Sequence, residues 1–490
     1  MKFILAIDLG TTGNRVIAFK KSGEIAARSY YEFPQIFPKP GWVEHNPLDI
    51  WDTTQKALND VLSEVGSENV DAIGITNQRE TTILWDKETG DPVYNAIVWQ
   101  CRRTKEICKQ LSGHSSIIKD KTGLPLDPYF SATKIKWIID NIPGVEQKIK
   151  DHQVIFGTVD TWILWKLTAG RIHATDPSNA ARTLCFNIKT LDYDDELLKI
   201  FGLPGHIFPE VKSSGGDFGI TDKKFTGHEI PIMGILGDQQ ASLFAHGGFE
   251  KGIVKNTYGT GLFVMSSTGA ELLPIENLVN TIAWELNGEV TYAIEGSIFI
   301  GGACIQWLRD GLNIINSAEE TGEMAGKLVS NEGVYFVPAL VGLGAPYWDP
   351  TARGMIIGIT RGTTREHFVR AVLESFAYQT RDVIEEINSN LKIEITKLSV
   401  DGGPTKNDFL MQFQADILGI PVERQNLIEM TALGTAGIAG ITSGFWDKKT
   451  FLNARKIDKT FIPNLEESKR KLFYSQWKEA VTRSLNWAHT

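Results

Sequence analysis

Two segments of this 490-residue chain share one pattern and lie about 250 residues apart. In the first, the strand Lys2–Ile7 is joined to the strand Arg15–Phe19 by a turn over residues 8–14 that contains Asp-Leu-Gly-Thr-Thr. In the second, Ile253–Thr257 is followed by Tyr-Gly-Thr-Gly and the strand Leu262–Met265. The repetition predicts two related halves, with a phosphate chain bound between the backbone N–H groups of the two turns. With 46 glycines in the chain, two such hairpins can also arise by chance.

Strand and helix patterns alternate along the rest of the chain, which is typical of α/β proteins. Asn46 and Pro47 predict a helix start, because asparagine favours the N-cap and proline the first helical position. The other elements that we expect are the strands Asp71–Thr76 and Lys397–Val400 and the helices Arg365–Asn388 and Phe409–Leu418, the last capped by Asn407.

The apolar pattern breaks and glycines cluster in the segment Phe244–Gly252. Such a segment is typical of a domain boundary. We therefore expect an N-terminal domain over residues 1–247 and a C-terminal domain over residues 248–490.

Charge and apolar patterning exclude several classes of protein. The chain has 50 Lys and Arg against 59 Asp and Glu, a net charge of −9, which argues against nucleic acid or an anionic membrane as the main partner. No segment supplies the roughly 20 apolar residues of a membrane-spanning helix. The first apolar run, Phe3–Ile7, is shorter than the roughly 7–15 residues of a signal-peptide core, so we expect a cytoplasmic protein.

The usual phosphate and zinc motifs are missing from the sequence. It has no GxxxxGK[ST], no GxGxxG after a strand and no HExxH, so a P-loop, a dinucleotide-binding unit and a catalytic zinc site have no support. Four scattered cysteines without a CxxC pair predict reduced, mostly buried thiols: Cys101, Cys108, Cys185 and Cys304.

Acidic residues beside turns are the remaining candidates for nucleotide chemistry. Asp8 ends a buried strand beside hydroxyl residues, where a carboxylate can hold Mg²⁺ through water. Asp401, Gly402 and Gly403 follow a strand, and the glycines let the backbone approach a flat adenosine group. Asp238 lies between a strand and a helix, where a carboxylate can take a proton from an attacking hydroxyl. Each also has a structural reading, as a common turn for the first two and as a helix N-cap for Asp238.

A second group of residues fits a small neutral molecule that carries hydroxyls. Arg79 and Glu80 in TNQRETT supply donors and acceptors together, and Gln239 can orient the same molecule by hydrogen bonds. Trp99 can exclude water from a short carbon chain, and the Tyr129 hydroxyl can reach the same site. Taken singly, Arg79 with Glu80 also fits a surface ion pair, and the two aromatic residues fit core packing.

Taken together, these segments resemble the FGGY carbohydrate kinases over essentially the whole chain. Many long matches in the right order make the resemblance specific. The matching segments are KPGWVEH (39–45), TNQRETT (76–82), IVWQCRRT (97–104), DPYFSATK (127–134), GTVDTW (157–162), GDQQ (237–240), NTYGTG (256–261), IQWLRD (305–310), GLGAPYWD (342–349) and NDFLMQFQ (407–414), with two signature stretches at 129–141 and 354–374.

The resemblance implies an α/β protein of two domains with the actin/hexokinase-like (ribonuclease H-like) fold and an interdomain cleft. ATP with Mg²⁺ is expected in the cleft, and the polyol deeper, against the first domain. TNQRETT and WQCRR are similar to the members that phosphorylate glycerol rather than pentuloses, which implies ATP-dependent phosphorylation of glycerol to sn-glycerol 3-phosphate. A kinase for another small polyol or ketose is the alternative. Homo-oligomers, as dimers or tetramers, are common in the family.

Residue-by-residue matching to the family motifs assigns roles to individual positions. Asp238 matches the catalytic base and Asp8 the carboxylate near Mg²⁺. Glycerol is expected to contact Arg79, Glu80, Trp99, Tyr129, Asp238, Gln239 and Phe263. The nucleotide is expected to contact Thr11, Thr12, Gly13, Arg15, Thr260, Gly302, Gln306, Gly403 and Asn407.

Two positions depart from the family pattern. The first phosphate turn usually has two serines where this chain has Gly13 and Asn14, so residue 13 offers only its backbone N–H and weaker nucleotide affinity is expected. Pro404 stands where the family usually has a small residue. We expect it to stiffen the loop that follows Asp401, where the resemblance places adenosine.

Two rival functions share the same fold. One is a nucleotide-dependent chaperone or binding module. The Arg79–Glu80 pair, Asp238 beside Gln239 and the missing peptide-binding extension argue against it. The other is a polyol sensor without catalysis, which the intact Asp8 and Asp238 disfavour.

The segment Thr221–Pro231 (TDKKFTGHEIP) generates a prediction about regulation. Regulated bacterial members of the family have a glycine-rich basic loop that binds a sugar bisphosphate, whereas this segment is short and has no arginine. We expect no inhibition by fructose 1,6-bisphosphate. Turnover at fixed ATP and rising bisphosphate measures this, and a fall in activity would contradict it.

Overall fold

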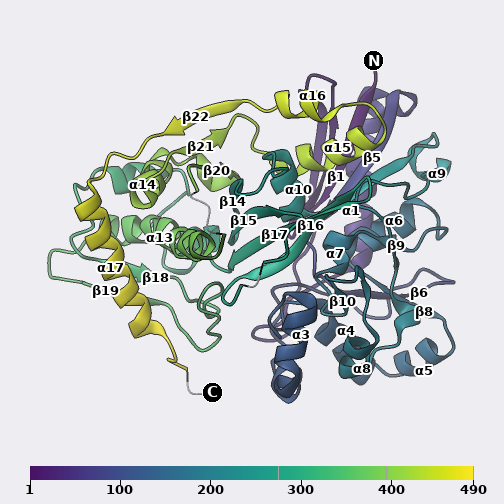
Figure 1. Ribbon diagram of the computed structural model, residues 1–490, viewed down its shortest axis with the longest axis horizontal. Helices are drawn as coiled ribbons and strands as arrows, with labels where there is room; N and C mark the ends of the chain where they lie inside the picture. The colour runs from purple at the N-terminus through teal and green to yellow at the C-terminus, as the bar shows by residue number, and fades with distance from the viewer. Residues whose placement is uncertain (274, 392–394, 489–490) are drawn as a thin grey trace.

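Two mixed β-sheets form the frame of the protein in the computed structural model, which describes residues 1–273, 275–391 and 395–488 (Figure 1). The first sheet has the strand order β13 (Ile232–Gly237), β5 (Val70–Asn77), β1 (Phe3–Leu9), β2 (Gly13–Phe19) and β3 (Ile25–Glu32). The second has the order β16 (Val279–Leu286), β17 (Glu289–Ile298), β15 (Leu262–Gly269), β14 (Val254–Tyr258), β20 (Leu398–Asp401), β21 (Val422–Gln425) and β22 (Ile457–Phe461).

The strand order of the first sheet recurs inside the second. β1 pairs antiparallel with β2 and parallel with β5, and β14 pairs in the same way with β15 and β20. β17 and β21 then take the places of β3 and β13. The prediction of two related halves is confirmed, with β16 and β22 added at the edges of the second sheet.

The remaining elements connect and cover these sheets. Up to residue 245 they are β4 (Glu44–His45), α1 (Pro47–Val65), η1 (Ser67–Asn69), β6 (Ile83–Asp86), β7 (Ala96–Ile97), α2 (Lys105–Gln110), η2 (Ser112–His114), α3 (Ser115–Thr122), α4 (Ser131–Asn141), α5 (Val145–Lys150), β8 (Val154–Gly157), α6 (Val159–Leu167), β9 (Ala174–Thr175), α7 (Pro177–Ala180), β10 (Phe186–Asn187), β11 (Asp192–Tyr193), α8 (Asp195–Phe201), η3 (Gly205–Ile207), β12 (Glu210–Val211), α9 (Lys223–Thr226) and α10 (Asp238–Ala245). After it they are α11 (Gly302–Gln306), the π-helix η4 (Trp307–Gly311), α12 (Glu320–Gly326), β18 (Tyr335–Val337), β19 (Met355–Ile357), α13 (Arg365–Leu391), η5 (Gly403–Lys406), α14 (Asp408–Leu418), α15 (Met430–Thr442), α16 (Lys448–Asn453) and α17 (Glu467–Ser484).

Side-chain caps fix the starts of two helices as the sequence predicts. Asn46 accepts a hydrogen bond from the Leu48 N–H at the start of α1, which packs on β2 and β3. Asn407 caps α14 through the Leu410 N–H. Each cap satisfies one of the backbone donors that the first helical turn leaves without a partner.

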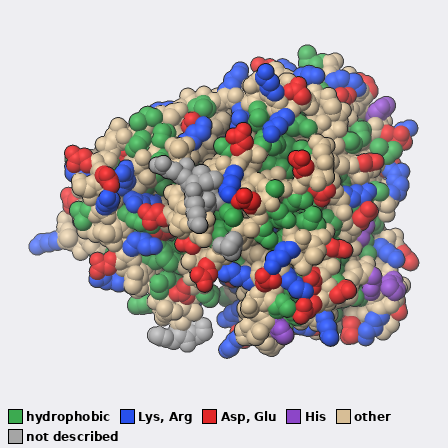
Figure 2. All heavy atoms as spheres, in the orientation of Figure 1, with side chains coloured by type: hydrophobic (Ala, Val, Ile, Leu, Met, Phe, Trp, Pro, Cys, Tyr) green, Lys and Arg blue, Asp and Glu red, His purple; other side chains and the backbone are tan. Residues whose placement is uncertain are grey.

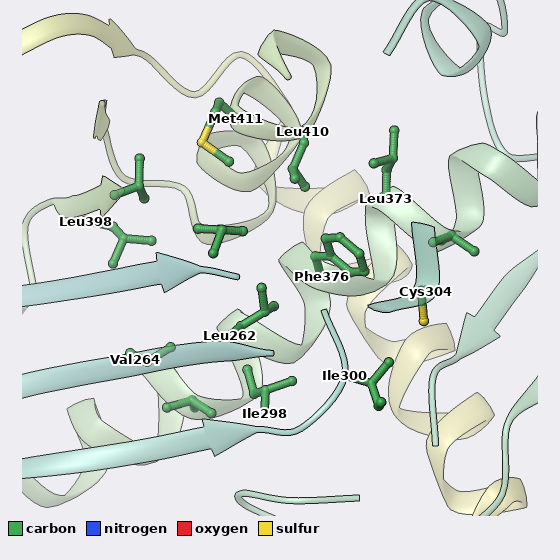
Figure 3. Packing of buried hydrophobic residues seen from close by; sticks show 14 of the residues in the cluster. Leu262, Val264, Ile298, Ile300, Cys304, Leu373, Phe376, Leu398, Leu410 and Met411 are labelled. Carbon is green, nitrogen blue, oxygen red and sulfur yellow. The ribbon is translucent and has the colours of Figure 1, made fainter. Parts of the chain in front are cut away.

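α13 and α14 cover one face of the second sheet and enclose a large apolar core. Leu262 and Val264 of β15 and Ile298 of β17 belong to the same buried cluster as Phe376 of α13 and Leu410 of α14 (Figure 3). Strand residues at every second position reach this core, because side chains alternate between the faces of a sheet.

The first hairpin turn is shorter than the sequence predicts. Instead of a turn over residues 8–14, β1 continues to Leu9 and β2 begins at Gly13. Leu9 pairs with Asn14, so the antiparallel ladder extends two residues further than the apolar pattern does. The buried Asn14 amide donates to the Ile50 carbonyl of α1 at 2.8 Å, which ties β2 to that helix.

Helix α15 belongs to the second half of the chain but packs against β1, β5 and β13 of the first sheet (Figure 1). It also packs against α10, and Gly434 makes the close approach possible. A Cβ at Gly434 would lie 1.8 Å from the carbonyl oxygen of Ala241 on α10. The two helices therefore join the halves of the molecule.

Acidic and basic side chains are interspersed over the face shown in Figure 2. In the ranges that the structure describes, no helix is long and apolar enough to span a membrane. All four cysteines are free and three of them are buried, as expected.

Replacing Gly434 by alanine is expected to destabilise the protein, because overpacking a tight contact costs roughly 1–3 kcal/mol. Gly326 at the end of α12 is the matched control, since a Cβ there meets nothing within 4 Å and alanine favours a helix. Chemical denaturation measures both free energies of unfolding. If the two variants are equally stable, the packing argument is wrong.

Candidate active site

Arg79 lies just beyond the carboxyl end of β5 and is almost fully buried, with 2% of its surface exposed. Its backbone has a φ of 52°, in the left-handed region that residues other than glycine seldom adopt. Its guanidinium donates to both carboxylate oxygens of Glu295, at 2.5 and 3.1 Å. Its sequence neighbour Glu80 is also buried, with Oε1 3.8 Å from Nε of Arg79. Burial excludes the surface ion pair that the sequence allows.

A second buried guanidinium completes what we call the ion cluster: Arg79, Arg182, Glu80 and Glu295. Arg182 donates to Glu80 at 2.6 Å and to Glu295 at 3.0 Å. Burial alone would raise the pKa of Glu295, but the two guanidinium groups hold it at about 2. Two positive and two negative groups thus balance in the interior.

Asp238 is the first residue of α10 and follows β13 directly. Its Oδ1 lies 3.1 Å from Nε of Arg79, while its side chain keeps 29% of its surface exposed. The N-cap of α10 is Gly237, so the reading of Asp238 as an N-cap is wrong. Burial raises the pKa of Asp238, and Arg79 opposes that shift. A carboxylate held on one side and open on the other can accept a proton from a substrate hydroxyl.

Trp99, Tyr129 and Phe263 form an aromatic wall beside Arg79. Trp99 packs edge-on against Tyr129 and Phe263, with ring centroids 5.8 and 6.0 Å apart. The Tyr129 hydroxyl accepts a hydrogen bond from Arg79 at 3.1 Å. The Trp99 indole N–H donates to Oγ1 of Thr11 at 3.0 Å, so the wall is tied to the first hairpin turn.

Asp8 and Arg15 lie beside that turn, in β1 and β2. Nη1 of Arg15 is 3.8 Å from Oδ2 of Asp8 and 3.7 Å from Oε1 of Glu429. Burial raises the pKa of Asp8 to about 6, which Arg15 opposes and Asp238 reinforces. No group of three or more His, Cys, Asp or Glu within the described ranges is placed to hold a metal ion.

The residues expected to bind adenosine come together around a cavity of about 540 Å³. Asn407 caps α14 with Oδ1 and donates to Thr321 through Nδ2, which leaves one of its N–H groups available. Gly402 has a φ of 93°, and a Cβ there would lie 2.0 Å from the carbonyl oxygen of Tyr258. The cavity is lined by the expected Thr260, Gly302, Gln306, Gly403 and Asn407, by Pro404, and by Arg309, Lys406 and Phe376, which were not predicted.

Thr260 connects this cavity with the aromatic wall. It also borders a smaller cavity of about 90 Å³ together with Trp99 and Tyr129. Since Thr11 contacts Trp99 directly, both hairpin turns reach the same wall. The structure thus places residues of both predicted phosphate turns beside the aromatic wall that also contacts Arg79.

Lys255 and Glu295 belong to this site but were not predicted from the sequence. They lie in one row of the second sheet, where Lys255 pairs with Met265 and Met265 with Glu295. Residues directly opposite in antiparallel strands share a face of the sheet. This face of the second sheet lies against the first half of the chain, where Glu295 contacts Arg79. The available signal was a charged residue inside an apolar strand, as in GIVKNTY and YAIEGSI.

Lys255 uses its three N–H donors inside the protein. Nζ donates to Oε1 of Gln239 at 2.5 Å, to Oγ1 of Thr257 at 2.9 Å and to the Phe263 carbonyl at 3.2 Å. Burial lowers the pKa of Lys255 to about 8, although nearby carboxylates such as Asp401 oppose the shift. Because an ammonium only donates, the amide oxygen of Gln239 faces Lys255 and its Nε2 is left to donate elsewhere.

Known proteins match this chain along its whole length. Residues 3–245 match the N-terminal domain of the FGGY family of carbohydrate kinases, and residues 254–443 match its C-terminal domain. The chain is 59% identical to the glycerol kinase of Aquifex aeolicus over 490 residues, 100% of both chains. It is 55% identical to glycerol kinase 2 of Thermotoga maritima over 493 residues, 99% of both chains.

Solved structures share the fold. The glycerol kinase of Plasmodium falciparum with ADP superposes with a TM-score of 0.90 at 37% identity, over 99% of this chain and 98% of that one. A ligand-bound xylulose kinase from Lactobacillus acidophilus gives a TM-score of 0.85 at 22% identity, over 99% and 97%, and shows the fold alone. The expected two-domain, actin-like α/β fold is confirmed.

Replacing Glu295 by glutamine is expected to lower the free energy of unfolding by roughly 3–5 kcal/mol, because it leaves a buried guanidinium charge unbalanced. The native pKa of Glu295 is lowered from its ordinary 4.5 to about 2. Its stabilising contribution is therefore complete above about pH 4.5 and is lost as the pH falls towards 2. Denaturant unfolding at pH 7 and pH 3.5 measures the loss of unfolding free energy on acidification. This loss should be smaller in Glu295→Gln than in the unmodified chain.

Glu479→Gln is the matched control, because Glu479 pairs with Arg483 on the exposed face of α17. Exposed pairs contribute little to stability, so this variant should unfold like the unmodified chain. If Glu295→Gln is no less stable than the control at pH 7, the ion cluster does not stabilise the fold.

Proposed function

This chain belongs to the FGGY family of carbohydrate kinases, and we propose that it transfers the γ-phosphoryl group of ATP to a terminal hydroxyl of glycerol, giving sn-glycerol 3-phosphate. The observation that carries the acceptor class is the ion cluster, neutral and buried, with Asp238 at its open side and the aromatic wall beside it. Its donors and acceptors suit adjacent hydroxyls, and the wall suits a short carbon chain.

The acceptor side of the reaction is assigned to side chains fixed before substrate arrives. Arg79 and Glu80 bind hydroxyls of glycerol, and Nε2 of Gln239 donates to another. Asp238 orients the attacking hydroxyl and accepts its proton. Phosphoryl transfer passes through a loose transition state, so the main contribution of these residues is to place the hydroxyl in line with the phosphorus. Tyr129 supports this geometry through its hydrogen bond with Arg79.

The nucleotide side is assigned to the two hairpins and the 540 Å³ cavity. The backbone and hydroxyls of the first turn (Thr11, Thr12, Gly13) and the guanidinium of Arg15 bind phosphate oxygens, with Thr260 opposite them. Asp8 fits a role in holding Mg²⁺, because its ion pair with Arg15 is long, 3.8 Å from Oδ2 to Nη1, which is beyond hydrogen-bond distance. Bound Mg²⁺ supplies neutralisation of phosphate charge. The adenosine group fits the cavity lined by Gly302, Gln306, Gly403 and Asn407.

The wider setting is also part of the proposal. We divide the chain into a polyol and phosphate domain, residues 1–247, and an adenosine domain, residues 248–490. We also propose a cytoplasmic location, which the short first apolar run supports, and a dimer or tetramer, since homo-oligomers are common in the family.

Coupled ADP release with Mg-ATP tests the acceptor directly, with glycerol, xylulose, ribulose, glucose and no acceptor compared side by side. Strong turnover that depends on glycerol supports the proposal. Turnover only with a ketose would keep the kinase mechanism and overturn the acceptor. ADP release that no acceptor stimulates would favour the chaperone or sensor reading.

Asp238→Asn is expected to lower kcat at least roughly 100-fold, as for loss of a general base, with only a small change in the KM for ATP. Asp120→Asn is the control, because Asp120 is exposed on α3 and pairs with Lys189. Steady-state kinetics with glycerol measure both variants. A kcat for Asp238→Asn close to that of the control would remove Asp238 from the chemistry.

A further inference from the structure

Tyr30 lies in the same row of the first sheet as Asp8 and Arg15. Asp8 pairs with Arg15 between β1 and β2, and Arg15 pairs with Tyr30 between β2 and β3. Side chains at directly opposite positions project from the same face. Cζ of Arg15 lies 5.4 Å from the centroid of the Tyr30 ring, within the range of a cation–π contact. Tyr30 therefore shares a face with the two charged groups assigned to the phosphate region.

The hydroxyl of Tyr30 reaches the turn of the first hairpin. Its Oη is 3.4 Å from Oγ1 of Thr12. It is also 2.7 Å from the point where a Cβ at residue 13 would stand. The backbone oxygen of Tyr31 is closer still, at 2.5 Å, so the strand backbone and the end of the Tyr30 side chain together occupy the space that a side chain at position 13 would need. Tyr30 keeps 42% of its surface exposed, so the sheet does not enclose it.

The neighbouring Tyr31 has a different environment. Successive side chains of a strand point to opposite faces, and the Tyr31 hydroxyl donates to Oδ2 of Asp60 on α1 at 2.7 Å. Its hydrogen is therefore used within the protein. Within the described part of the chain, the Tyr30 hydroxyl has only the long contact with Thr12, which leaves its hydrogen for a stronger acceptor.

We propose that the Tyr30 hydroxyl donates a hydrogen bond to a phosphate oxygen of ATP, and so supplies from β3 the hydroxyl that Gly13 lacks. This inference rests on the proposed function, which puts the phosphates at this turn. A phosphate oxygen is charged, and hydrogen bonds to charged acceptors are shorter and stronger than those between neutral groups. The ring lies against Arg15 and also restricts the orientation of that guanidinium.

The test compares Tyr30→Phe with Tyr31→Phe in the full-length chain, because each removes one hydroxyl at adjacent positions and keeps the ring. Calorimetry without glycerol gives the Kd values of Mg-ATP, ADP and adenosine. We expect Tyr30→Phe to weaken Mg-ATP about tenfold, the size of a lost hydrogen bond to a charged group, and to leave adenosine unchanged. Tyr31→Phe should leave all three unchanged. In turnover assays, Tyr30→Phe should raise the KM for ATP and not that for glycerol.

Three results would overturn the inference. Unchanged Mg-ATP binding in Tyr30→Phe would mean that the hydroxyl makes no phosphate contact. An equal loss for adenosine would mean that the substitution disturbs the whole cleft, and an equal loss in Tyr31→Phe would mean that the effect is not specific to Tyr30. The proposed function fails on a different observation, the absence of glycerol-dependent turnover in the unmodified chain.

Discussion

Two guanidinium groups can be buried beside each other only if negative charge lies against both of them. An unpaired ion loses several kcal/mol of hydration in a protein interior. Glu295 and Glu80 offset that loss for Arg79 and Arg182 through four hydrogen bonds of 2.5–3.1 Å. Glu295 comes from β17 and the other three residues come from the first half of the chain. The charge balance of the ion cluster therefore exists only when the two halves are joined, and the orientation of Arg79 towards Asp238 depends on that contact between the halves.

The repeated sheet explains why the two hairpins have different chemistry despite one topology. Aligning Asp-Leu-Gly-Thr with Thr-Tyr-Gly-Thr places Thr257 at the position of Asp8. The first hairpin keeps a carboxylate and Arg15, groups suited to phosphates and a cation. In the second, Thr257 accepts a hydrogen bond from Lys255 instead, and the backbone at Gly402 packs tightly against Tyr258 beside the 540 Å³ cavity. The two hairpins thus differ at matching positions, with a carboxylate at Asp8 in the first and a hydroxyl at Thr257 in the second.

Local signals made much of this structure predictable. The caps at Asn46 and Asn407, the paired hairpins and the resemblance of TNQRETT to known pockets all lie within short segments, where a few residues determine the outcome. The partner of Arg79 does not lie within a short segment. The sequence suggests an ion pair with the neighbouring Glu80, whereas the carboxylate closest to Arg79 belongs to Glu295, 216 positions away. Ion pairs of this kind depend on how the two sheets pack against each other. The spacing of residues within one segment carries no information about that packing. The same holds for Lys255 and for Tyr30, whose roles follow from strand register.

Helix α15 has a consequence for synthesis on the ribosome. The strands of the first sheet and α10 are complete at residue 245, but the helix that covers β1, β5 and β13 ends only at Thr442. At roughly 5–20 residues per second, the intervening segment of about 200 residues takes on the order of 10–40 s to translate. Throughout that interval an apolar face of the first sheet has no permanent cover. The N-terminal half is therefore synthesised first, but its sheet receives its last covering helix only after residue 442 has been made.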